Sequence, residues 1–146
     1  MKVLIIYESK HHGNTKKLVD AIAERYEVEV VNAAENPQVE YSAYDIIGFA
    51  SGIAYGKFYK NVTSYAQKLP EGKKVFFLYT CANNDKDFAA DIRDKAEMCG
   101  CTSVGSYGCK GYNTYGPLKL IGGMNRSHPD QDEIAEALHF YKSLIL

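Results

Sequence analysis

The stretch "VLIIYESKHHGNTKKLVDAIAERY", from Val3 to Tyr26, sets the pattern of the whole chain. It opens with an unbroken apolar run over residues 3–7, which indicates a buried strand. Apolar side chains then recur at helical spacing, at Leu18, Val19, Ile22, Ala23 and Tyr26. Between the two segments lies "ESKHHGNT", residues 8–15. Because a helix start presents unpaired N–H groups and a partial positive charge, these polar residues predict an anion site.

Length and composition predict one folded domain over residues 1–146. The chain has 46% hydrophobic and 24% charged residues, as in ordinary globular proteins and unlike disordered ones. Seventeen Lys+Arg stand against eighteen Asp+Glu, a formal net charge of −1. This balance argues against nucleic acid and against an anionic membrane as partners. We therefore expect function to reside in a specific site.

The lengths of the apolar runs and the spacing of the cysteines indicate the cellular compartment of the protein. Every apolar run falls short of the roughly 20 residues that span a bilayer, and one lysine followed by a strand replaces a signal sequence at the start. We therefore expect a cytoplasmic protein. The four cysteines lack the doubled CxxC spacing of a zinc site: Cys81, Cys99, Cys101 and Cys109. Reduced thiols and no metal site are expected.

Four further segments have the character of strands. They are "VEVVNA" (28–33), "DIIGFAS" (45–51), "KKVFFLYT" (73–80) and "TSVGSYGCKG" (102–111). Helical segments alternate with them, and a fifth helix comes last, entered through "SHPDQDE" with Pro129 in its first turn. Five strands alternating with helices predict an α/β fold with a doubly wound, five-stranded parallel sheet.

Ligands of such sheets bind at the carboxyl ends of the strands, so the loops after strands one, three and four are compared with known chemistries. The first has no GxGxxG for a dinucleotide and no GxxxxGK[ST] for a nucleoside triphosphate, and strand three does not close with a phospho-accepting aspartate. Residues 112–128, "YNTYGPLKLIGGMNRSH", lack a clean period and predict a long loop before the last helix.

The first loop resembles the phosphate loop of the flavodoxin family, which has the form S/T-x-T-G-x-T. In "SKHHGNT" (9–15), Gly13, Asn14 and Thr15 match, His12 replaces a threonine, and the loop holds one additional residue. The resemblance extends over the whole chain, since strand count and loop positions agree. It implies a flavodoxin-like sheet of order 2-1-3-4-5 and FMN as the cofactor.

The first loop supplies the candidate phosphate-binding residues. Gly13 allows close backbone approach, hydroxyls donate hydrogen bonds, and imidazoles add donors or partial positive charge. The candidates are Ser9, His11, His12, Gly13, Asn14 and Thr15. Two other interpretations remain open: the histidines are simply solvated, or the segment only caps the helix through Asn14 or Thr15.

The second loop, "ASGIAYGKFY" (50–59), follows strand three. The resemblance implies that it wraps the isoalloxazine ring, with Tyr55 as the first choice for stacking and Tyr59 on the surface of the next helix. The ring-binding candidates are Ser51, Gly52, Ile53, Ala54, Tyr55 and Gly56. Alternatively, the segment is a glycine-rich turn whose aromatic residues belong to the core.

The third loop, "TCANND" (80–85), follows strand four. By the resemblance it runs along the pyrimidine edge of the flavin, through Thr80, Cys81, Ala82 and Asn83. Asn84 and Asp85 are expected to cap the next helix. Cys81 lacks a nearby histidine or lysine in sequence, so we expect it to pack against the cofactor, with no catalytic residue in the chain.

Three functions remain open. The first is an FMN-binding electron carrier between redox partner proteins, in which the flavin supplies the redox chemistry. The second is an FMN-dependent NAD(P)H or quinone reductase, and the third is a flavin-free binding module of the same fold. Typical flavodoxins are strongly acidic whereas this chain is nearly neutral, so the redox partners stay undetermined.

Overall fold

The computed structural model describes residues 1–112, 120 and 122–146. Its strands are β1 (Val3–Glu8), β2 (Glu29–Asn32), β3 (Ile46–Ala54), β4 (Lys57–Phe58), β5 (Lys74–Cys81) and β6 (Thr102–Lys110). Its α-helices are α1 (Asn14–Arg25), α2 (Lys60–Ala66), α3 (Ala90–Met98) and α4 (Gln131–Ile145). Of the 17 residues of the long loop predicted over 112–128, the eight at 113–119 and 121 lie outside the described residues.

Five strands form a parallel sheet in the order β2-β1-β3-β5-β6. With the short β4 set aside, this is the predicted order 2-1-3-4-5, so the predicted doubly wound fold is confirmed. The sheet has a sixth strand that the sequence did not predict, because β4 has only two residues and therefore no period. It pairs antiparallel with the end of β3, where Ile53 lies opposite Phe58.

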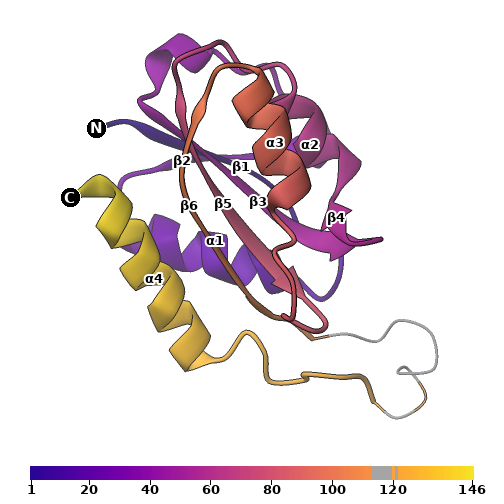
Figure 1. Cartoon of the computed structure of the whole chain (residues 1–146). Helices are drawn as coiled ribbons and strands as arrows, with labels where there is room; N and C mark the ends of the chain where they lie inside the picture. Colours follow the sequence, from indigo (N-terminus) through magenta and orange to yellow (C-terminus); the bar gives the residue numbers. More distant parts are fainter. Residues whose placement is uncertain (113–119, 121) are drawn as a thin grey trace.

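The helices form two layers. In Figure 1, α1 and α4 cover one face of the sheet while α2 and α3 cover the other. The prediction of five helices is wrong, since the described residues contain four α-helices. Between β2 and β3 the chain forms only two short 3-10 turns, η1 (Ala33–Glu35) and η2 (Tyr41–Ala43). Asn36 adopts a left-handed φ of 50° there, and Pro37 cannot continue a helix.

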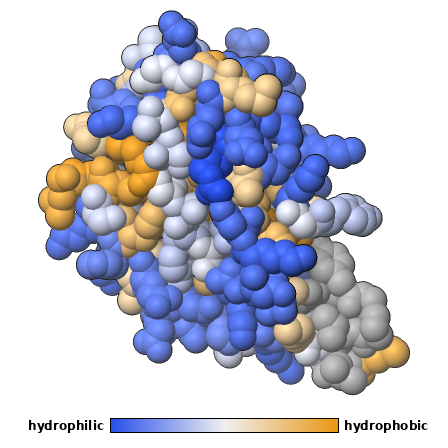
Figure 2. Space-filling view, in the orientation of Figure 1, coloured by the Kyte–Doolittle hydropathy of each residue, from blue (hydrophilic) through white to orange (hydrophobic). Residues whose placement is uncertain are grey.

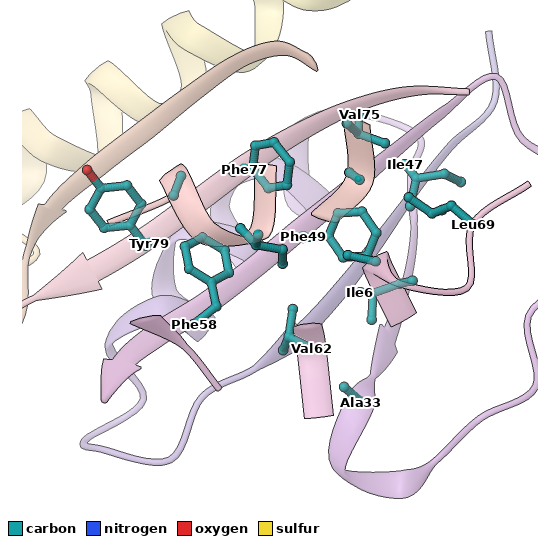
Figure 3. Packing of buried hydrophobic residues seen from close by; sticks show 14 of the residues in the cluster. Ile6, Ala33, Ile47, Phe49, Phe58, Val62, Leu69, Val75, Phe77 and Tyr79 are labelled. Atoms are coloured by element: carbon teal, nitrogen blue, oxygen red, sulfur yellow. The ribbon is translucent and has the colours of Figure 1, made fainter. Parts of the chain in front are cut away.

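Alternate residues of each central strand pack on opposite faces. Ile6, Phe49 and Phe77 face α2 and α3 in the cluster of Figure 3. Ile5 and Phe76 face α1 and α4 in a second cluster. All five side chains are fully buried. Burial on both faces explains the unbroken apolar runs from which these strands were predicted.

Helix α4 begins later than predicted. Asp130 is its N-cap, and the Asp130 carboxylate accepts the backbone N–H of Glu133 at 2.9 Å. The Glu133 carboxylate accepts the Asp130 N–H at 3.0 Å, which completes a capping box. Pro129 therefore lies before the N-cap and not in the first turn.

The surface of the described residues is mixed. Figure 2 shows hydrophobic residues gathered where α4 ends, and Leu146 is exposed there. Among the described residues, none of the helices combines the length and the apolar character that crossing a bilayer needs.

Candidate functional site

The three predicted loops meet at the carboxyl ends of the strands. A cavity of about 70 Å³ lies there. Nine of the predicted residues line it: Ser9, His11, Asn14, Thr15, Gly52, Ile53, Thr80, Cys81 and Ala82. The sheet brings them together because β1, β3 and β5 are parallel neighbours that end at one edge. The cavity is thus the point on which the sequence predictions converge.

A larger groove of about 430 Å³ adjoins the cavity and shares Ile53 and Tyr59 with it. Two more predicted residues, Ala54 and Tyr55, line the groove beside Lys10. Five predicted residues line neither space: His12, Gly13, Ser51, Gly56 and Asn83. A tricyclic ring needs a pocket of roughly 300 Å³ or more, so the groove has ring dimensions and the small cavity does not.

The N-cap residue of α1 provides no side-chain hydrogen bond to the helix. Gly13 is the N-cap residue, with a left-handed φ of 64°, and His12 before it has a φ of 56°. The Ser9 hydroxyl accepts the backbone N–H of Lys16 at 3.2 Å. The interpretation of the loop as a plain cap through Asn14 or Thr15 is therefore wrong, because both side chains bond elsewhere.

Asn14 ties the first loop to the end of β6. Its amide Nδ2 donates to the Tyr112 carbonyl at 2.7 Å, and its Oδ1 accepts the Tyr112 N–H at 3.1 Å. The same N–H also donates to the carbonyl of His128 at 3.0 Å. Gly111 is essential to this contact, since an added Cβ would lie 2.6 Å from Asn14 Nδ2. The helix start is therefore fixed by a partner 98 residues away.

Thr15 ties the first loop to β5. Its hydroxyl is buried and lies 2.8 Å from the hydroxyl of Thr80. A hydroxyl has one donor and two acceptor positions. When Thr80 donates to Thr15, the proton of Thr15 stays available to an oxygen in the cavity.

The two histidines occupy different environments. Burial, and secondarily the neighbouring His12, lowers the pKa of His11 below its ordinary value, so its imidazole is neutral at pH 7. His11 lines the cavity. The His12 ring instead stacks on Tyr112, with ring centroids 4.0 Å apart. His11 is therefore partly packed, whereas the His12 ring stays exposed to solvent beside Tyr112. The interpretation that the histidines are simply solvated is not supported for His11.

The second loop is a β-hairpin. Tyr55 and Gly56 form its turn, with left-handed φ angles of 54° and 78° that match the turn type favoured in two-residue hairpins. Tyr55 is fully exposed. The buried Ser51 hydroxyl accepts the backbone N–H of Tyr59 at 2.9 Å and so closes the base of the hairpin.

The prediction that Tyr59 lies on a helix surface is wrong. Tyr59 is only 7% exposed and precedes α2, and the short hairpin turns its ring back over Gly52. A Cβ at Gly52 would lie 2.4 Å from the Tyr59 hydroxyl, so only glycine fits below this ring. The Lys10 ammonium lies 4.8 Å from the centroid of the Tyr59 ring.

The third loop leads into α3 without the predicted caps. The helix begins at Ala90, and Asp87 accepts the N–H of Ala89 at 3.1 Å. Asn84 instead donates to the carbonyl of Gly108 at 2.9 Å. The predicted caps at Asn84 and Asp85 are therefore wrong, because this loop extends further than its composition indicates.

Cys81 is a packing residue of the cavity. Burial raises the pKa of its thiol to about 12, so the thiol is neutral at pH 7. The thiol donates to the carbonyl of Cys109 at 3.4 Å. All four cysteines are free. A nucleophilic role for Cys81 is therefore not supported.

Sequence reasoning missed three lining residues: Tyr59, Gly111 and Tyr112. Gly111 and Tyr112 could have been found from the sequence, because Gly111 ends the fifth predicted strand and that strand ends at the same edge of the sheet. It also missed the partners of Glu8, whose carboxylate is 3% exposed. The Asn61 amide donates to it at 3.1 Å, and the Lys10 ammonium lies 3.9 Å from it. This carboxylate links the first loop to α2.

Among the described residues, one group of possible metal ligands lies outside the lining of the cavity, where α4 begins. His128, Asp130 and Glu133 place ligand atoms within 4.8 Å of one another. Both carboxylates already hold the capping box of α4, and Glu133 also accepts the N–H of Lys110 at 3.2 Å. The group is thus accounted for by the helix start.

The comparisons with known proteins agree with this geometry. The profile of a family described as flavodoxin domain matches residues 4–110. An uncharacterized protein of Methanocaldococcus jannaschii is 37% identical over 148 residues, which cover 99% of each chain.

Two solved structures share the fold. A flavoprotein of Lactobacillus acidophilus in complex with FMN has a TM-score of 0.58 at 18% identity, covering 75% of this chain and 92% of that one. The two-electron reduced flavodoxin of Megasphaera elsdenii has a TM-score of 0.61 at 22% identity, covering 93% and 97%. Together with the family match, these findings lead to one conclusion: the chain belongs to the flavodoxin domain family.

Proposed function

We propose that the chain binds FMN and carries electrons between redox partners. One observation carries the proposal: three loops predicted separately line a single cavity at the start of α1. The cavity, at about 70 Å³, has room for a group of the size of a phosphate. Backbone N–H groups and the helix dipole favour an anion there. Thr15 and His11 add side-chain donors or partial positive charge.

The ring of FMN would lie in the adjoining groove. Ile53 and Tyr59 are shared by the two spaces, so a ligand whose phosphate occupies the first can extend into the second. Gly52 brings the backbone of β3 close to this junction. The M. elsdenii and L. acidophilus structures support the choice of a flavin, since the latter holds FMN. FMN supplies the redox chemistry, and the chain binds it and limits its contact with water.

A reductase is the second candidate. A further groove of about 450 Å³, lined by Lys57, Phe58 and Asn61 among others, opens beside the proposed ring site and could admit a small oxidant. The carrier is preferred because the described residues that line the cavity offer few groups suited to proton transfer: His11 is neutral, and burial raises the pKa of Cys81 to about 12.

The test begins with the absorption spectrum of the purified protein and with titrations of FMN and riboflavin. The proposal expects a yellow protein that binds FMN at least tenfold more tightly than riboflavin, since one hydrogen bond to a charged group is worth about 1.5 to 3 kcal/mol. Equal affinities would place the phosphate elsewhere, and failure to retain FMN at micromolar concentration would favour the flavin-free module.

A potentiometric titration of the FMN-loaded protein then separates carrier from reductase. A carrier takes up electrons singly, so reduction proceeds in two resolved steps. A single two-electron step, with steady oxidation of NAD(P)H by the protein alone, would favour the reductase.

A further inference from the structure

The loops around the proposed flavin site carry a strong excess of positive charge. We define the basic face as residues 9–17, 52–61, 82–89, 110–112 and 122–130, which follow β1, β3, β5 and β6 or bond to them. These segments contain seven Lys and one Arg against three Asp, a net charge of +5. The whole chain has a net charge of −1, so all other residues together carry −6. The molecule is therefore strongly polarised although it is nearly neutral.

The excess of positive charge remains when neighbouring carboxylates and a bound phosphate are counted. Glu8 at the end of β1 and Glu35 in the turn after the edge strand β2 each subtract one charge and lower the total to +3. A bound phosphate monoester would remove about two further charges at pH 7. A positive balance remains at the edge of the sheet where a flavin would exchange electrons. FMN binding alone thus does not account for the charge.

The part of the basic face on the hairpin has the features of a docking surface. Lys10, Lys57 and Lys60 line a groove of about 450 Å³, and none of the described residues that line it is acidic. Lys10 and Lys57 lie 3.9 and 3.8 Å from the carboxylates of Glu8 and Asp91. Glu8 is 4% exposed and Asp91 29% exposed, but the side chains of the two lysines are 60% and 62% exposed. The ammonium groups are therefore open to solvent and to a partner.

Tyr55 projects from the same hairpin. It is fully exposed and holds a left-handed φ of 54°, a conformation that L-residues with large side chains rarely adopt. The turn would form more easily with Asn in this position. Exposed tyrosines flanked by complementary charge are frequent centres of binding energy in protein interfaces. Folding therefore does not require tyrosine in this position, which also lines the groove proposed for the flavin ring.

We propose that the basic face docks an acidic electron-transfer protein, with Tyr55 in the contact. Electron transfer after docking rests on the proposed flavin function. In this step one electron passes from the reduced flavin to the oxidised metal centre of the partner, and no bond forms between the proteins. The docking itself needs no flavin. A protein fits better than a small anion because the cations lie on several loops, and only three share a groove. Opposite charge steers such encounters and fixes their orientation.

The test uses two probes of opposite charge, an acidic plant-type ferredoxin and a basic c-type cytochrome. The ¹⁵N-labelled protein, with and without FMN, is titrated with each probe at low salt and at about 0.2 M salt. We expect ferredoxin to shift the amide signals of residues 9–17 and 52–61, and its affinity to fall roughly tenfold or more with added salt. Preference for the cytochrome, or no binding of ferredoxin, would overturn the proposal.

Matched charge reversals at the two ends of α2 sharpen the test. The variant Lys60→Glu, at the first residue of α2, should weaken ferredoxin binding roughly threefold to tenfold. The control Lys68→Glu reverses an exposed charge beyond the other end of α2 and should leave the affinity within about twofold. Circular dichroism checks that the variants are folded. Equal losses in both would mean that net charge, and not the basic face, drives binding.

Two further readouts keep the alternatives apart. A short DNA duplex that binds as tightly as ferredoxin would make the face a general polyanion site and overturn the proposal. FMN retention is measured on the same samples. Ferredoxin binding by a protein that fails to retain FMN would support docking and refute the flavin function, whereas FMN retention without ferredoxin binding would do the reverse.

Discussion

The first loop and the hairpin border the same site but are held in opposite ways. The first loop is fixed from far along the chain, through Asn14 to Tyr112 and Thr15 to Thr80. The hairpin is held at its base by Ser51 and Tyr59, eight residues apart, while Tyr55 at its tip is fully exposed. The proposed phosphate end is therefore preorganised by contacts from the whole fold. The proposed ring end is a local element that is able to adapt to a ligand or partner.

The largest effect is expected from cutting the Asn14 contact. Asn14→Ala removes two hydrogen bonds and leaves the Tyr112 carbonyl without its amide donor, which should lower the free energy of unfolding by about 2 to 4 kcal/mol. Urea denaturation measures the change. Asn83→Ala, which loses one exposed contact to Asp85, is the control and should change stability by less than about 0.5 kcal/mol. Similar losses in the two variants would show that the first loop is not specially fixed.

The next effect concerns affinity at the proposed phosphate end. Thr15→Val keeps the shape of the side chain but removes the hydroxyl, and should weaken FMN binding roughly tenfold to a hundredfold. Riboflavin, which lacks the phosphate, should lose much less. Fluorescence titration of both ligands gives the ratio.

Thr63→Val is the matched control for this variant. The Thr63 hydroxyl is buried on α2 and has no hydrogen-bond partner among the described residues. Its removal should leave the affinities for both flavins unchanged. A parallel loss of FMN and riboflavin affinity in Thr15→Val would argue that Thr15 acts only through packing.

A smaller effect is expected from pH. The pKa of His11 is lowered in the free protein by burial, and a bound phosphate anion would favour the charged imidazole and raise this pKa. Binding would then take up a proton, so FMN affinity should strengthen as pH falls from about 7.5 toward 6, by at most tenfold per unit of pKa change. His11→Gln should flatten this dependence more than His12→Gln, since His12 stacks on Tyr112. If neither variant changes the profile, the histidines have no electrostatic role.

The smallest effect is expected at the hairpin tip. Tyr55→Asn replaces a residue strained at a φ of 54° by one that favours this turn, and should raise the free energy of unfolding by about 0.5 to 1 kcal/mol. Thermal and urea unfolding measure it. A clear loss of stability would show that Tyr55 serves folding, and would remove its special place in the docking proposal.

The sequence predicted what depends on local pattern. Unbroken apolar runs identified the three central strands, short strand-like segments identified the two edge strands, and the glycines and polar residues at strand ends located the loops of the site. The sequence did not predict features that depend on contacts between residues far apart in the chain. Asn14 was interpreted as a possible cap because its neighbours in sequence allow capping, but its partner is Tyr112. Tyr59 was misplaced because a two-residue strand has no period that would reveal the reversal of the chain.

The hydrogen bond from Tyr112 to His128 has a consequence for protein engineering. It fixes the two ends of the intervening segment against each other, and Asn14 holds the same N–H from the other side. A substitution that disturbs the backbone of Tyr112 would therefore act on two helices at once: on the start of α1 through Asn14, and on the approach to α4 through His128.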